Sequence, residues 1–128
     1  MKKMRIGSGA GYSGDRIEPA IELAEKGNLD YLVFECLAER TIAIAQQLKM
    51  KDPEKGYDPL LAERVEAVLP VCREKRVKII TNMGAANIGA LNFVMHNALG
   101  GGVTCTLAMD IHGKSLSSAI LEMDIPDK

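Results

Sequence analysis

A glycine-rich segment near the start of the chain, GSGAGYSGDR from Gly7 to Arg16, has the composition of an anion-binding loop. Gly9, Gly11 and Gly14 have the G-x-G-x-x-G spacing, in which missing side chains let phosphate oxygens reach backbone N–H groups at the start of a helix. The letters SGDR extend the segment past the point where a dinucleotide fingerprint would already be helical. The pattern therefore favours an anionic or phosphate-bearing ligand in general over NAD. The alternative is a flexible turn that needs glycine only for positive φ.

A second polar segment, FECLAER from Phe34 to Arg40, follows an apolar run. Glu35 lies 21 positions after the last of the three spaced glycines, about where a ribose-binding carboxylate would lie in a dinucleotide site. At the end of a buried strand, partial burial would suit this carboxyl group to act as a general base. Arg40 has the chemistry to clamp a carboxylate or phosphate, and the alternative is a structural salt bridge with Glu39 or Asp15.

A third segment, TNMGAAN from Thr81 to Asn87, combines amides with small residues. Asn82 and Asn87 can hold carbonyl or hydroxyl groups of a ligand, and the residues around Gly84 leave room for it. The alternative is an Asx-turn with a helix cap at Asn87.

The elements that must position these segments alternate between strands and helices. Apolar runs of β-forming residues predict strands, and apolar residues at helical spacing predict helices between them. The expected strands are a short one ending at Ile6, then Asp30–Phe34, Val77–Thr81 and Val103–Met109. The expected helices cover residues 16–26, 38–50, 59–70, 91–99 and 115–121.

Local signals define the ends of these helices. Asp15 and Glu18 have the spacing of a capping box, and Gly27 supplies a left-handed stop. Asp58, followed by proline, has the pattern of an N-cap. Pro70 should kink its helix or end it early.

Helices between successive strands require crossover connections, so the sheet should be largely parallel. The expected fold class is α/β: a three-layer, mostly parallel sheet of about four strands with flanking helices, Rossmann-like, in a single domain over residues 1–128. Ligands of such sheets bind outside the carboxyl ends of the strands. The loops that leave those ends are 7–16, 35–40, 81–87 and 110–115, and the first three are the segments above.

Composition narrows the function classes. The formal net charge is −1, so we expect no nucleic-acid partner, and no apolar run approaches the roughly 20 residues of a membrane span. Three widely spaced cysteines and two histidines favour a reducing cytoplasm and no metal site. Cys36 has no histidine near it in the sequence, so packing is expected rather than an activated thiolate. His96 lies in an apolar stretch and is expected to be structural.

The three segments together resemble the N-terminal part of the acyclic terpene utilisation AtuA-like family. The resemblance rests on RIGSGAGYSGDRIEPAIELAEKGNLDYLVFECLAERTIAIAQ, YDPLL and KIITNMGAAN, and covers residues 5–87. It implies an α/β domain in catabolic proteins that are often encoded beside acyl-CoA enzymes, in a group associated with breakdown of acyclic terpenes such as citronellol and geraniol. It indicates a pathway and not a reaction, and it identifies no cofactor.

Residue by residue, the resemblance carries over three sets of positions that are expected to bind a ligand. From the first motif these are Gly7, Gly9, Gly11, Ser13, Gly14, Asp15 and Arg16. From the second and third motifs they are Glu35, Glu39, Arg40, Thr41, Asn82, Gly84 and Asn87, with Glu35 as the expected catalytic base or orienting group.

After Asn87 the sequence is expected to diverge from the family, so residues 88–128 form a divergent tail and the chain is expected to be a truncated version of a larger domain. Two hypotheses follow. In the first, the chain is an enzyme or enzyme fragment that binds a phosphate-bearing or carboxylate small molecule, for example a CoA thioester. In the second, it is a non-catalytic binding or assembly module that self-associates through an exposed sheet edge.

Overall fold

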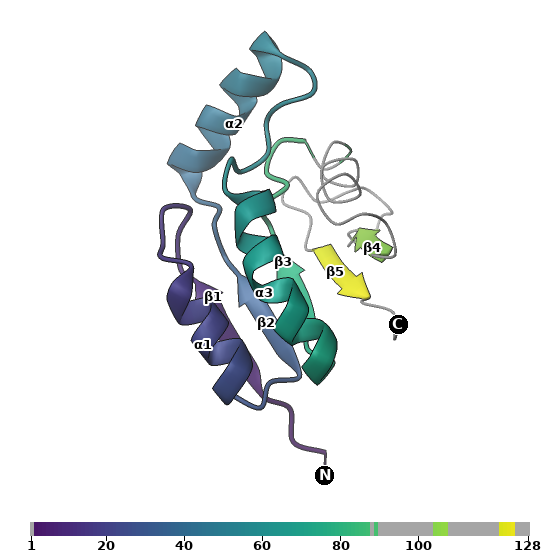
Figure 1. Ribbon diagram of the computed structural model, residues 1–128. Helices are drawn as coiled ribbons and strands as arrows, with labels where there is room; N and C mark the ends of the chain where they lie inside the picture. Colours follow the sequence, from purple (N-terminus) through teal and green to yellow (C-terminus); the bar gives the residue numbers. More distant parts are fainter. Residues whose placement is uncertain (1, 88, 90–103, 108–120, 125–128) are drawn as a thin grey trace.

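Parallel strands joined by helices form the first part of the fold (Figure 1). The computed structural model describes residues 2–87, 89, 104–107 and 121–124. The elements in chain order are β1 (Ile6–Ala10), α1 (Glu18–Lys26), β2 (Tyr31–Phe34), α2 (Glu39–Lys51), α3 (Leu61–Lys75), β3 (Lys78–Thr81), β4 (Thr104–Leu107) and β5 (Leu121–Asp124). This order confirms the α/β class.

The sheet has the strand order β1-β2-β3-β5-β4. The first three strands are parallel, and their register places Ile6 beside Tyr31 and Tyr31 beside Lys78. Beyond β3 the pairing changes, because β5 runs antiparallel to β3 and β4 runs antiparallel to β5. The expectation of about four mostly parallel strands is therefore confirmed only for three. The fourth expected strand exists as β4, but it runs antiparallel to its neighbour.

Helices α1 and α3 cover one face of the parallel strands (Figure 1). The order β1-β2-β3 moves in one direction across the sheet, so two right-handed crossovers place α1 and α3 on the same side (Figure 1). The core of the fold fills the space between these helices and the sheet. Its fully buried members are Ala24, Leu32, Phe34, Leu61, Val65, Val68, Cys72 and Ile79.

Two expected helices fall mostly on residues that are not described. The helix expected over residues 91–99, with His96, lies outside the described residues, as does the loop expected over 110–115. Leu121, expected to end a short helix, instead begins β5. The described helices α1 and α3 thus form one layer against the sheet, whereas α2 lies beyond the carboxyl ends of the strands (Figure 1).

Strand β1 extends four residues further than predicted, so Gly7 and Gly9 lie in a strand and not in a loop. A Cβ atom on Gly7 would lie 2.6 Å from Leu29 Cδ1, and one on Gly9 would lie 2.5 Å from Phe34 Cε1. Neither glycine has positive φ; among the described glycines, positive φ occurs at Gly56. Close packing is therefore what demands glycine in this strand.

The ends of the helices differ from prediction for local reasons. Asp15 forms no capping box, because its carboxylate binds the N–H groups of Gly11 and Arg16. Gly27 keeps a right-handed φ of −77°, and the left-handed conformation falls on Asn28.

Helix α3 departs from prediction at both ends. Its regular turns begin at Leu61, and Asp58 still accepts a hydrogen bond from the Leu60 N–H at 2.9 Å, as a capping residue would. At the other end, Pro70 does not end α3, which continues to Lys75.

Replacement of Gly9 by alanine is expected to lower the free energy of unfolding by about 1–3 kcal/mol, because the new methyl group must displace the buried Phe34 ring. Urea denaturation measures the change. Gly11→Ala is the matched control: its Cβ would have Asp15 Oδ2 as nearest neighbour at 3.9 Å, so a change within about 0.5 kcal/mol is expected. Equal losses for both variants would contradict the packing explanation.

Candidate functional site

The loops that follow β2 and β3 are joined by the side chain of Asn82. Its Oδ1 accepts a hydrogen bond from the Cys36 N–H at 2.9 Å, and its Nδ2 donates to Glu35 Oε1 at 2.9 Å. The same Glu35 oxygen accepts from the Leu37 N–H at 3.1 Å. The neighbouring carboxyl ends of parallel strands therefore bring Glu35 and Asn82 together, as the sequence predicted.

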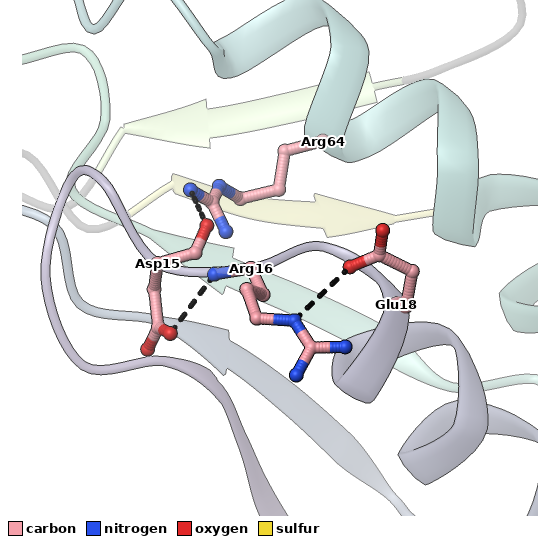
Figure 2. A network of polar contacts seen from close by, with 4 residues as sticks. All are labelled: Asp15, Arg16, Glu18 and Arg64. Carbon is pink, nitrogen blue, oxygen red and sulfur yellow. Dashed lines mark hydrogen bonds and ion pairs between the residues drawn. The ribbon is translucent and has the colours of Figure 1, made fainter.

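The loop after β1 is held by Asp58, which lies just before α3, and by Arg64, which lies near the start of α3 and is drawn in Figure 2. The Ser13 hydroxyl donates to Asp58 Oδ2 at 2.6 Å. Arg64 Nη2 donates to the backbone oxygens of Ser13 and Asp15, both at 2.9 Å. Because the Asp58 N–H also donates to the Met83 oxygen at 2.8 Å, the same connection joins the first loop to the third.

Arg64 is the largest fully buried side chain among the described residues. Its Nε and Nη1 atoms have no hydrogen-bond partner, and it forms no ion pair with the described carboxylates. The centroid of the Phe34 ring lies 6.0 Å from the guanidinium carbon of Arg64, at the limit of a cation–π contact. Burial of a charge with so few partners is costly, so the two hydrogen bonds to the first loop are its main compensation.

Sequence reasoning missed Arg64 and treated Asp58 only as a helix cap. Arg64 sits between Leu61, Val65 and Val68 on the buried side of α3. The sequence did contain a signal for Arg64, because it is the one charged residue among the apolar residues that form the buried side of the helix. An arginine at such a position is either buried or interrupts the apolar face of the helix.

A cavity of about 200 Å³ lies between α2 and the three loops. The polar side chains of its wall are those of Ser13, Cys36, Thr41, Asp58 and Asn82, together with the hydroxyl group of Tyr57. Most of the remaining wall is apolar, from Leu37, Ile44, Ala45, Leu48, Tyr57, Pro59, Met83 and Ala85. Such a cavity has the mostly apolar lining of a small-molecule site, and its volume suits only a short chain.

The predicted ligand-binding residues are distributed unevenly around this cavity. Ser13, Thr41 and Asn82 line it. Glu35 is exposed and touches the wall through Asn82. Five further residues of the predicted set are exposed and do not line the cavity, namely Gly11, Gly14, Arg16, Glu39 and Arg40.

The remaining predicted residues have structural partners. Asp15 closes the first loop, and Arg16 Nε lies 3.7 Å from the Glu18 carboxylate (Figure 2). Asn87 donates from Nδ2 to the backbone oxygens of Pro53 and Lys55, both at 2.8 Å, and its N–H binds the Gly84 oxygen. Asn87 thereby fastens the connection between α2 and α3 to the third loop.

The two described cysteine side chains are poor nucleophiles. Burial raises the pKa of Cys36 to about 12, although the charge of Arg64 opposes this shift, and burial raises the pKa of Cys72 to about 11. Both thiols are therefore protonated near neutral pH, and Cys36 offers the cavity a weakly polar wall. This agrees with the predicted packing role of Cys36.

The described residues contain no cluster of three or more histidine, cysteine, aspartate or glutamate side chains that could hold a metal ion. Within the same residues, no helix has the length and apolar character needed to cross a membrane.

Comparison with known proteins identifies the family. A model described as acyclic terpene utilisation family protein AtuA matches residues 4–123. The match continues past Asn87, so it includes most of the segment that the sequence resemblance had set apart as divergent. No curated protein and no solved structure matches the chain.

Replacement of Arg64 by methionine is expected to release the first loop, because two hydrogen bonds from a charged donor are lost. Trypsin should then cleave after the exposed Arg16 about tenfold faster or more, as followed by mass spectrometry of the fragments. Arg73→Met, an exposed position on the same helix, is the control and should cleave there at the wild-type rate. Unchanged cleavage in Arg64→Met would contradict the anchoring role.

The first loop should loosen in acid. Hydrogen bonds from the Gly11 and Arg16 N–H groups hold the pKa of Asp15 below its ordinary value of 3.8. Because the folded pKa is lowered, this stabilisation is present above pH 3.8 and is lost as pH falls through the folded value. The Gly11 amide chemical shift should titrate with a midpoint below 3.8, and Asp15→Asn should remove the titration. A midpoint at or above 3.8 would show that the two bonds do not hold the charged form.

Proposed function

Since the chain belongs to the acyclic terpene utilisation family AtuA, we propose that it acts in terpene catabolism by binding a phosphate-bearing or carboxylate small molecule at the carboxyl ends of β1, β2 and β3. The observation that carries this proposal is the cavity of about 200 Å³ between α2 and the three loops. Its apolar wall suits an aliphatic chain, which is the common feature of acyclic terpenes and their breakdown products.

The charged part of such a ligand would lie outside the cavity. Among the described residues no lysine or arginine lines it, whereas Arg16 and Arg40 are exposed next to the first and second loops. Arg40 lies in the first turn of α2, where the N–H groups of the helix favour negative charge. A CoA thioester fits this division, because it joins an apolar acyl chain to phosphate groups.

Glu35 is proposed as the group that orients the ligand or accepts a proton from it. Its carboxylate is fixed by Asn82 Nδ2 and the Leu37 N–H, at the rim of the cavity. A general base needs a fixed position within reach of the proton that it removes, and both bonds supply such a position.

Hexanoyl-CoA is expected to stabilise the protein more than free CoA does, because the acyl chain adds apolar burial. At about a hundred times its Kd the thioester should contribute roughly 2–3 kcal/mol, measured as a shift in thermal unfolding. Ala45→Phe fills the cavity and should abolish the difference between the two compounds, relative to the unliganded variant. Ala43→Phe, at an exposed position on the same helix, should preserve it.

Two results would oppose this function. Equal stabilisation by hexanoyl-CoA and free CoA would show that the acyl chain does not bind in the cavity. No shift with either compound, together with a dimer that forms as concentration rises, would instead support the assembly module. The position of β1 at the edge of the sheet, with Ile6 66% exposed, is the feature through which such an assembly would form.

A further inference from the structure

Asp58 places a buried carboxylate in the wall of the cavity. The residue is 7% exposed, and its two oxygens accept hydrogen bonds from the Ser13 hydroxyl and the Leu60 N–H. Its own N–H donates to the Met83 oxygen. Three bonds from three parts of the chain therefore fix the position of this negative charge.

No described cation shares the cavity wall with this carboxylate. Arg64 does not line the cavity, and its one engaged nitrogen, Nη2, donates to backbone oxygens of the first loop. In surroundings that are mostly apolar, the repulsion between Asp58 and a second negative charge would be only weakly screened. A ligand group that enters this space should therefore be uncharged.

The hydroxyl groups of Ser13 and Thr41, two of the residues in the wall, already donate their protons within the protein. Ser13 donates its proton to Asp58, and Thr41 donates its proton to the Ala38 oxygen. The Ser13 oxygen keeps acceptor capacity once its proton is used, whereas the Thr41 oxygen already accepts from the Ala38 N–H at 2.6 Å. The wall around Asp58 thus matches a ligand group that donates a hydrogen bond.

We infer that Asp58 makes the cavity select an uncharged, hydrogen-bond-donating end of an aliphatic ligand, such as a hydroxyl or amide, and exclude a free carboxylate. This inference rests on the proposed function, because it takes the cavity as the ligand site. It narrows the ligand classes proposed above, because a free acid cannot place its carboxylate beside Asp58, whereas an alcohol or amide can place its hydrogen-bond donor there.

Hexanamide, 1-hexanol and hexanoate test the inference directly by calorimetric titration near neutral pH. Hexanamide and hexanoate have the same chain and nearly the same shape, and they differ in charge and in N–H donors. Wild-type protein should bind hexanamide and hexanol, and should bind hexanoate about tenfold more weakly or worse. Asp58→Asn should reduce this discrimination, since asparagine can still cap α3 and accept the Ser13 proton.

Ser13→Ala is the matched control, because it removes a hydrogen bond and keeps the charge; it should still discriminate against hexanoate. Hexanoate binding to wild-type protein as tightly as hexanamide would overturn the inference, as would discrimination that Asp58→Asn leaves unchanged or a lack of binding by all three compounds. A different result would count against the proposed thioester ligand without affecting this inference. Binding of hexanol with Asp58-dependent exclusion of hexanoate, without any effect of hexanoyl-CoA, would refute only the thioester.

Discussion

The attachment of the first loop to the start of α3 is the constraint on which the site depends. Ser13 lies in a loop after β1, and Asp58 and Arg64 lie 45 and 51 residues further along the chain. Through these contacts the first loop meets the connection that precedes β3, although β2 lies between β1 and β3 in the sheet. Because Asp58 also binds the third loop through Met83, the wall of the cavity is assembled from distant parts of the sequence.

Much of the fold follows from local patterns in the sequence. Strands β2 and β3 were predictable because each is a continuous run of β-forming residues, and α2 was predictable because few residues in its range oppose a helix. The part of β1 after Ile6 was not, because its glycines have poor strand propensity. They are required by the approach of Leu29 and Phe34, which only tertiary structure creates. The antiparallel pairing of β4 and β5 could not be predicted from local sequence either, because strand direction depends on the path of the chain between the two strands.

The site was predictable at the level of loops but not of side chains. The rule that ligands bind at the carboxyl ends of parallel strands correctly brought Glu35 and Asn82 together. It gave no means of knowing that Gly7 and Gly9 belong to a packed strand, or that Asp58 lines the cavity. A residue such as Asp58 has a sufficient local explanation as a helix cap, so its second role became visible only when the first loop was placed beside it.

Helix α2 is fastened at both ends to the segment that follows β3. Just before the helix begins, the Cys36 N–H donates a hydrogen bond to Asn82 Oδ1. Near its end, Lys49 Nζ donates to the Ala86 oxygen, and Asn87 Nδ2 donates to the Pro53 oxygen just after the helix. Because both ends of α2 are held, the helix cannot rotate about one end while the other end moves freely. Any outward movement of α2 must pull the segment after β3 with it, and that segment pulls on Asp58 through Met83. Entry of the proposed ligand between α2 and the loops would therefore involve the helix, the segment after β3 and the glycine-rich loop together.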